Sequence, residues 1–153
     1  MWINQLQIIG EIALSMFLGG ILGIEREISD KPAGFRTIML VAGATTLLMR
    51  MGDVLIVHYS EMLAIDIVKI DPSRIIQAVI TGISFLGAGT IIRRRQDDHV
   101  EGLTTAAIIL LAGGIGICVA LNQFILAIGV TILGLIVARI LGIIHAKIHR
   151  QKL

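Results

Sequence analysis

Charged residues are scarce in this chain of 153 residues, where Lys, Arg, Asp and Glu together make up 16%. An ordinary soluble domain contains about 25% of them. Hydrophobic residues make up 56% of the chain, and the mean hydropathy is +0.90. These values exclude a soluble globular fold. They indicate one integral membrane domain over residues 1–153, with no room for a separate soluble domain.

Cysteine is nearly missing as well, since Cys118 stands alone in an apolar run, so no disulfide can form within the chain. The N-terminus has no basic segment and no small-residue cleavage site. We therefore interpret residues 1–24 as a retained span with Trp2 at its interface, not as a signal peptide. No set of nucleophile, base and acid is recognisable, so an enzyme is not expected.

What the chain does have is a series of apolar runs that approach or exceed the roughly 18 residues of a membrane span. Backbone groups in hydrocarbon must be satisfied within helices, so we expect an all-α bundle of five transmembrane helices. Asp71 and Pro72 suit the N-cap and first position of the third helix. Residues 53–70 are expected to be interfacial or re-entrant. The expected spans are 5–24, 36–49 or beyond, 72–92, 104–121 and 124–144.

Basic residues gather at the ends of these runs, a pattern of membrane topology and not of nucleic-acid binding. Ten Lys and Arg residues lie on one side of the expected spans and three on the other. The positive-inside rule then places the N-terminus outside and the C-terminus in the cytoplasm of a multi-pass protein of the plasma membrane.

An internal repeat is also present. A shift of 68 residues aligns residues 18–44 with residues 86–112 without a gap, and eight of the 27 positions are identical. Both segments are hairpins of the same orientation. We therefore expect two parallel hairpin repeats, spans 1–2 and spans 3–4, with the fifth span unmatched.

The two hairpin loops carry opposite charges at equivalent positions, Glu25 and Glu27 in the first and Arg93 and Arg95 in the second. One hypothesis is that the loops meet through these charges, with Arg26 turned toward its own loop. The alternative is that all are solvated, because exposed ion pairs contribute little. Gly34 and Gly102 precede spans and are expected in turn conformations that a side chain would strain. The remaining residues of this cytoplasmic loop motif are Lys31, Arg36, Thr37, Thr104 and Thr105.

The order and spacing of several short motifs resemble the MgtC/SapB family of bacterial inner-membrane proteins. The resemblance runs from about residue 8 to residue 144. The motifs that carry it are GGILGIERE at 19–27, KPAGFRT at 31–37, LVAGATTLL at 40–48, DPSRI at 71–75, GISFLGAGTIIRR at 82–94 and VEGLTTAA at 100–107.

This resemblance implies a role in magnesium homeostasis, by passage of a cation or by control of transport. It leaves two alternatives open. One is a regulatory membrane module that binds another membrane complex, such as an ATP synthase or a transporter, and the other is a small-solute transporter. MgtC-type members read GLNTAA where this chain has Thr104 followed by Thr105, and they carry a soluble C-terminal domain. The resemblance is therefore closer to the short SapB-like branch.

Glycines recur within the spans at spacings that let helix backbones approach closely, and Gly19 with Gly23 forms a GxxxG pair. The other interpretation is a substrate path lined by bare backbone. The residues expected to serve helix packing are Gly19, Gly23, Gly82, Gly87 and Gly89.

Glu11 is the one carboxylate inside an expected span, and Arg50 follows the second apolar run. Each lies 13 residues from the cytoplasmic end of its span, which is about 20 Å of helix at 1.5 Å per residue. An unpaired charge at that depth is costly. We therefore predict that Glu11 and Arg50 face each other, with Thr81 at similar depth. The pair is either a fixed clamp or a gate that a cation opens by competing for Glu11.

Glu11 is also the candidate metal ligand. Mg²⁺ prefers oxygen ligands and keeps several waters, so Glu11 would need help from Thr81, Ser84 or a second subunit. His145 and His149 lack the further ligands of a transition-metal site and fit a basic interfacial tail better. No cofactor is required, and Mg²⁺ stays open as a ligand or a substrate. A homodimer is expected, because five spans are few and the glycine faces need partners.

Overall fold

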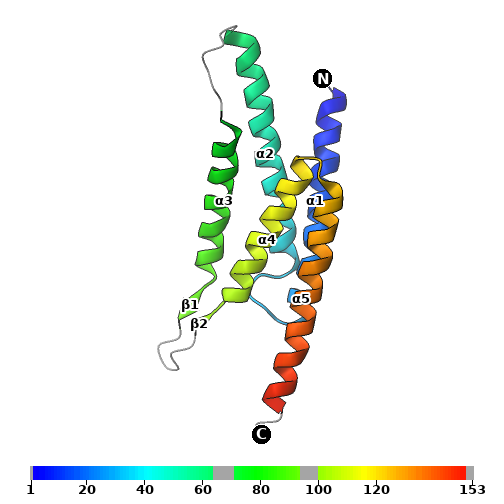
Figure 1. The fold of residues 1–153 in the computed structure, drawn as a ribbon, viewed down its shortest axis with the longest axis vertical. Helices are drawn as coiled ribbons and strands as arrows, with labels where there is room; N and C mark the ends of the chain where they lie inside the picture. Colours follow the sequence, from blue (N-terminus) through cyan, green and yellow to red (C-terminus); the bar gives the residue numbers. More distant parts are fainter. Residues whose placement is uncertain (1, 64–70, 94–99, 151–153) are drawn as a thin grey trace.

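The computed structural model describes residues 2–63, 71–93 and 100–150, and these are almost entirely helical. The helices run roughly along one long axis, with the two ends of the chain at opposite ends of the molecule (Figure 1). The five helices are α1 (Trp2–Ile28), α2 (Phe35–Leu63), α3 (Pro72–Gly89), α4 (Leu103–Ala120) and α5 (Phe124–Arg150). Two short antiparallel strands, β1 (Ile92–Arg93) and β2 (Val100–Glu101), join α3 to α4.

The second helix differs from its prediction. The α-helix continues without a break from Phe35 to Leu63, so residues 53–63 are not a separate interfacial or re-entrant segment. The charged side chain of Asp53 faces a hollow beside α1, so it does not interrupt the helix. Residues 64–70, which include the rest of the expected interfacial segment, lie outside the described residues.

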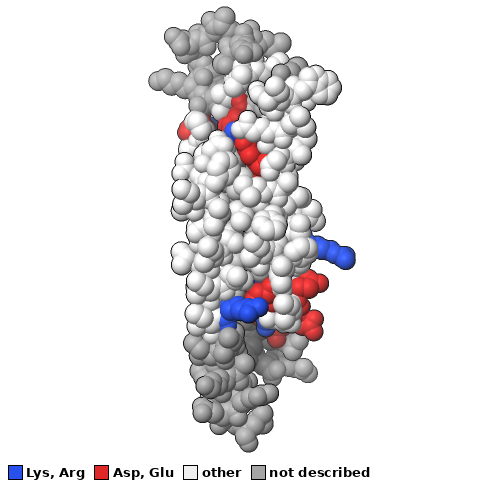
Figure 2. All heavy atoms as spheres, turned by 90° about the vertical axis from the view of Figure 1, so that its right-hand side faces the viewer, with Lys and Arg blue, Asp and Glu red and all other residues white. Residues whose placement is uncertain are grey.

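Three helical stretches in the described part of the chain are long and apolar enough to cross a membrane: Trp2–Ile28, Phe35–His58 and Leu103–Ala120. α5 adds a shorter apolar stretch, Phe124–Ile140. On the face that Figure 2 shows, Lys, Arg, Asp and Glu side chains gather toward two levels, with an uncharged surface between them. This distribution is that of a bundle with an apolar belt.

The third helix begins as predicted and ends earlier. Asp71 caps α3 by accepting a hydrogen bond from the Ser73 backbone N–H at 3.0 Å, and Pro72 follows it. Hydrogen bonding to Ser73 lowers the pKa of the exposed Asp71. The expected span to residue 92 stops at Gly89, because the chain turns at Thr90 into the β-hairpin.

α1 and α2 form a close antiparallel hairpin in which small residues replace side chains at the contact. A Cβ at Gly19 would lie 2.8 Å from the Ala42 Cβ, and one at Gly23 would lie 2.7 Å from the Phe35 Cα. Such contacts require glycine, because the opposing atoms belong to backbone or to a side chain that cannot retreat. The tight approach fixes the register between the two helices.

α4 occupies the centre of the bundle and packs against the other four helices. Its buried side chains include Ile109, Ile115 and Val119, each at most 1% exposed. α5 covers α1 and α4, with Gly134 between Leu22 and Leu111. α3 packs against α4 and α2 and stands at one side of the bundle (Figure 1).

Helices α2 and α4 begin at equivalent positions of the predicted repeat, one residue after Gly34 and Gly102. Gly102 has φ +92°, the left-handed conformation expected for it. The expectation for Gly34 is wrong, because its φ is not positive. A side chain there would instead overlap the Glu27 carboxylate. The connections also differ, since the β-hairpin of the second has no counterpart among residues 29–34.

Candidate functional site

Glu11 of α1 and Arg50 of α2 form a two-pronged ion pair between the helices. Arg50 Nε donates to Glu11 Oε2 at 2.6 Å, and Arg50 Nη2 donates to Glu11 Oε1 at 2.7 Å. Glu11 is 5% exposed and the Arg50 side chain is 18% exposed. Parallel charge-assisted bonds of this kind are short and strong, and they fix orientation as well as charge. The structure thus brings together the two residues that their matched depths predicted to meet.

The pair belongs to a regular register between α1 and α2. Glu11 faces Arg50, and eight residues further along α1 Gly19 faces Ala42, eight residues earlier on α2. Halfway between these two contacts, Ser15 therefore lies opposite Thr46, about one helical turn inward from the ion pair. Both of these hydroxyl residues are fully buried. Thr46 Oγ1 donates to the Gly116 carbonyl of α4 at 3.0 Å.

A line of buried oxygen atoms therefore continues inward from the ion pair. Ser15 Oγ bonds to Ile12 O, and Thr45 Oγ1 bonds to Val41 O. Buried polar groups in an apolar bundle are uncommon unless they are hydrogen-bonded, and each of these is. The buried positions of these threonines were not predicted from the sequence, although the ATT within LVAGATTLL was an available signal.

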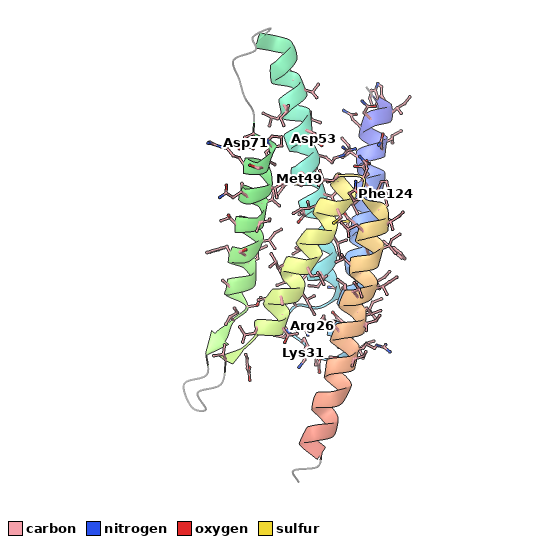
Figure 3. The ribbon with its side chains drawn as sticks, in the orientation of Figure 1. Arg26, Lys31, Met49, Asp53, Asp71 and Phe124 are labelled. Atoms are coloured by element: carbon pink, nitrogen blue, oxygen red, sulfur yellow. The ribbon has the colours of Figure 1, made fainter. Side chains whose placement is uncertain are left out.

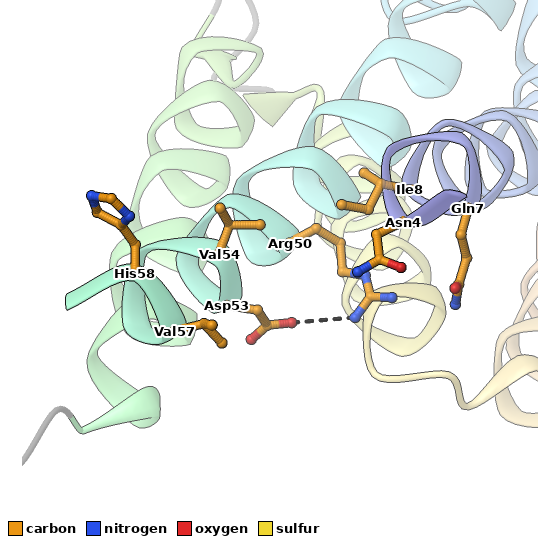
Figure 4. A pocket seen from close by; sticks show the side chains of 8 residues that line it. All are labelled: Asn4, Gln7, Ile8, Arg50, Asp53, Val54, Val57 and His58. Carbon is orange, nitrogen blue, oxygen red and sulfur yellow. Dashed lines mark hydrogen bonds and ion pairs between the residues drawn. The ribbon is translucent and has the colours of Figure 1, made fainter. Parts of the chain in front are cut away.

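A hollow opens above the pair toward one end of α1 and α2 (Figure 4). Its volume is about 460 Å³, and its lining is mostly apolar, with polar side chains contributed by both helices. The Asp53 carboxylate accepts from Arg50 Nη1 at 3.4 Å and is 54% exposed, while Gln7 Nε2 donates to Glu11 Oε1 at 3.2 Å. The lining residues are Asn4, Gln7, Ile8, Arg50, Asp53, Val54, Val57 and His58.

Thr81 lies elsewhere. Its hydroxyl donates to the Gln77 carbonyl of its own helix at 2.8 Å, and the residue is exposed. α3 packs on α4 and α2, so Thr81 contributes nothing to the Glu11–Arg50 pair. Its prediction used only the distance of Thr81 from the cytoplasmic end of its span, and this distance does not tell on which face of α3 the residue lies.

A second polar contact joins helices near the opposite end of α1, where Figure 3 labels Arg26. Arg26 is 4% exposed, and its Nη2 donates to Thr105 Oγ1 in the first turn of α4 at 2.5 Å. The Arg26 Nε and the Glu25 Oε2 are buried without a hydrogen-bond partner among the described residues. Arg26 therefore turns toward α4, and the expectation that it faces its own loop is wrong.

The remaining loop residues take separate positions. Glu25 accepts from Ser29 Oγ at 3.0 Å, and Glu27 accepts from the Phe35 N–H at 2.9 Å. Glu27 thereby ties the end of α1 to the start of α2. The predicted contact with Arg93 and Arg95 involves side chains outside the described residues. The exposed members of the motif are Glu27, Lys31, Arg36, Thr37 and Thr104.

The predicted packing glycines divide into two groups. Gly19, Gly23 and Gly87 lie against neighbouring helices, and Gly87 faces Ala106 of α4. Gly82 and Gly89 are different, because a Cβ at either would meet nothing within 4 Å. These two lie on the open side of α3. The spacing of glycines in the sequence could not distinguish this side from the packed side.

Among the described residues, no group of three or more His, Cys, Asp or Glu side chains is placed to hold a metal ion. Glu11, the predicted ligand, has both oxygens engaged by Arg50. The side chains of His145 and His149 lie outside the described set. A divalent ion at Glu11 would therefore have to displace the guanidinium.

A helical bundle with an apolar belt, tight glycine contacts and an ion pair between its helices is an integral membrane protein. The model of the MgtC family matches residues 12–147, and the chain belongs to that family. Two relatives, a Haemophilus influenzae protein and "Putative magnesium transporter YhiD" of Escherichia coli K12, are each 34% identical. They align with 97% and 84% of this chain and with 61% and 58% of their own lengths.

Two further relatives also match. Protein SapB of Bacillus subtilis is 31% identical over 76% of this chain, and protein MgtC of Salmonella typhimurium is 36% identical over 78%. The chain spans 48% and 46% of these two relatives, so it covers about half of their length. No solved structure matches the chain.

Proposed function

We propose that the chain acts in magnesium homeostasis as a multi-pass protein of the bacterial inner membrane, with a cation path closed by the Glu11–Arg50 pair. Family membership and the provisional naming of YhiD as a magnesium transporter support the ion. The single observation that carries the path is the buried Glu11–Arg50 ion pair beside a hollow that Arg50 and Asp53 help to line.

The chemistry of the pair suits a gate. A hydrated Mg²⁺ entering the hollow meets Asp53 first, because that carboxylate is the exposed one. It then competes with Arg50 for Glu11. Beyond the pair, Ser15, Thr45 and Thr46 offer oxygen atoms, the ligand type that Mg²⁺ prefers. Opening requires Arg50 to move toward Asp53, which already accepts one of its N–H groups.

Magnesium uptake by purified protein in liposomes tests this directly. The liposomes enclose a magnesium-sensitive dye, and the rate is compared with protein-free liposomes. Uptake should rise in proportion to protein density, and Glu11→Gln should abolish it. Ser29→Ala is a matched control, because Ser29 is an exposed residue that bonds only at the loop end. No uptake at high protein density would reject passage by this chain alone.

The second candidate is a regulatory module that binds another membrane complex, such as an ATP synthase or a transporter. The observation that favours it is the Arg50 guanidinium, which occupies both Glu11 oxygens, so this carboxylate is not free to bind a cation. In this case the pair is a fixed clamp. Co-purification with a partner from native membranes, lost when exposed loop residues such as Arg36 are changed, would support this alternative.

The arrangement in the membrane is part of the proposal. The N-terminus and the Glu11 hollow face outward, and Arg26 and the C-terminus face the cytoplasm, because most Lys and Arg lie at that end. The protein works as a homodimer without enzymatic activity. Labelling of single cysteines at Asn4 and Lys31 by an impermeant thiol reagent on intact cells should modify the first and spare the second.

A further inference from the structure

The outer face of α3 carries a stripe of polar and small residues that no other described helix covers. Gln77, Thr81, Ser84 and Ala88 recur every three or four residues, so they lie along one side of the helix. All four are exposed, whereas Val79, Ile83 and Gly87 on the opposite side are buried against the bundle. The Thr81 hydroxyl donates to the Gln77 carbonyl of its own helix, whereas the exposed Gln77 amide has no hydrogen-bond partner among the described residues.

Lipid is a poor cover for this stripe. Polar groups in a bilayer face protein or water, because hydrocarbon offers them no hydrogen bond. The exposed faces of α1, α2 and α5 carry large apolar side chains such as Phe17, Leu40 and Leu133, each at least 60% exposed. α3 also exposes Phe85 and Leu86, but it combines them with a polar row that small residues flank, namely Ala78, Gly82 and Gly89.

Comparison of α3 with α1, its counterpart in the predicted repeat, shows that α3 has fewer helical neighbours. Its predicted equivalent, α1, is covered by α2, α4 and α5, but α3 packs only on α4 and α2. A Cβ at Gly82 or Gly89 would meet nothing, so there is room beside α3 for another helix to approach closely. The cover that α5 gives to α1 has no counterpart within the described chain.

We propose that the polar face of α3 is the contact surface between two copies of this chain. A second copy fits because the stripe is self-complementary. An amide both donates and accepts hydrogen bonds, and so does a hydroxyl, so Gln77, Thr81 and Ser84 can each pair with the same stripe across a two-fold axis. The exposed Asp71 and Arg74 at the start of α3 carry opposite charges that pair crosswise in such a dimer.

This assignment rests on the dimer proposed above and not on magnesium passage. Cross-linking tests it in a Cys118→Ala background, which removes the native thiol. Single cysteines replace Gln77, Thr81, Ser84 and Ala88 on the stripe, and Ile80 and Leu133 serve as exposed controls. All positions are exposed, so each variant keeps the packing of the bundle. Native membranes are oxidised, and dimers are resolved without reducing agent.

The expected result is a periodic pattern, with dimer yields several-fold higher at the stripe than at Ile80 or Leu133. Equal yields at all positions, or no dimer at the stripe, would overturn the assignment. An adduct of another mass would overturn it as well, because it would identify a different protein as the occupant. Magnesium uptake is measured separately, so transport without a stripe cross-link rejects the surface and leaves the proposed function standing.

A second measurement uses the protein in mild detergent, where mass is determined by light scattering. Gln77→Leu together with Thr81→Leu should lower the dimer fraction several-fold. Leu133→Ala, an exposed change of similar size on α5, should leave it unchanged. A wild-type protein that is monomeric at high concentration, and also gives no cross-link in membranes, would remove the dimer itself.

Discussion

The guanidinium of Arg26 reaches from the end of α1 to the hydroxyl of Thr105 in the first turn of α4. These helices are not consecutive, so the bond joins the first hairpin of the chain to the second. Glu11 lies 15 residues earlier on α1, or roughly 22 Å along the helix. The α1 helix is therefore fastened by a polar contact toward each end, to α2 through Glu11 and to α4 through Arg26.

Thr105→Val should destabilise the protein by about 1–3 kcal/mol, because it leaves a buried guanidinium without its hydrogen-bond partner. Chemical denaturation in detergent, followed by helix content, measures the change. Thr45→Val is the matched control, since that threonine is equally buried but bonds only to the Val41 carbonyl of its own helix. Equal losses in the two variants would mean that the contact between α1 and α4 contributes nothing specific.

Gly23→Ala should destabilise the protein more than a glycine-to-alanine change at any other position of α1. The new Cβ would lie 2.7 Å from the Phe35 Cα, and backbone cannot retreat as a flexible side chain does. Overpacking of this kind costs about 1–3 kcal/mol. The thermal midpoint in detergent is the measurement.

Gly10→Ala supplies the control for that change, on the same helix. A Cβ at Gly10 meets nothing within 4 Å, so alanine should be neutral or should stabilise α1 by roughly 0.5–1 kcal/mol through its better helix propensity. If Gly10→Ala is as damaging as Gly23→Ala, the contact with Phe35 is not the cause of the loss.

Gly102→Ala tests the turn before α4. Its φ of +92° is strained for any residue with a Cβ, and that Cβ would also collide with the Thr90 carbonyl. The left-handed conformation alone costs about 1–2 kcal/mol. Amide hydrogen exchange should show faster opening in the first turn of α4, and exchange unchanged from the wild type would contradict the prediction.

The sequence predicted the parts of the fold that follow from local rules. Apolar runs indicated the helices, and Asp71 with Pro72 marked the start of α3 correctly. It failed at α2, where Asp53 and His58 suggested the end of a span. A charged side chain ends a span only if it faces lipid, and the hollow beside α1 removes that condition.

The candidate site was predictable where two residues shared a helix hairpin. Glu11 and Arg50 met because a short loop joins antiparallel helices and fixes their relative depth. Thr81 and Arg26 were misplaced because their contacts depend on how non-consecutive helices are arranged. The spacing of polar residues along one helix does not tell which neighbouring helix its polar face will contact. The bond between Arg26 and Thr105 could therefore be recognised only in the packed structure.

The Glu11–Arg50 pair gives the sharpest test of the site. Glu11→Gln alone leaves a mostly buried guanidinium without its counter-charge, and Arg50→Gln alone leaves a buried carboxylate. Breaking a buried pair from one side costs about 3–5 kcal/mol, and the lower end applies because the Arg50 side chain is 18% exposed. The double variant should lose much less than the sum of the single changes, because no unpaired charge remains. Denaturation in detergent measures all three.

Uptake by the same variants separates a clamp from a gate. If the pair is a gate, Arg50→Gln frees Glu11 and should raise magnesium entry, while Glu11→Gln abolishes it at any stability. If it is a clamp, both single changes should lower activity only as far as they lower the folded fraction, and the double variant should recover both. Additive losses of stability would show that the two side chains do not depend on each other, against the bidentate geometry at 2.6 and 2.7 Å.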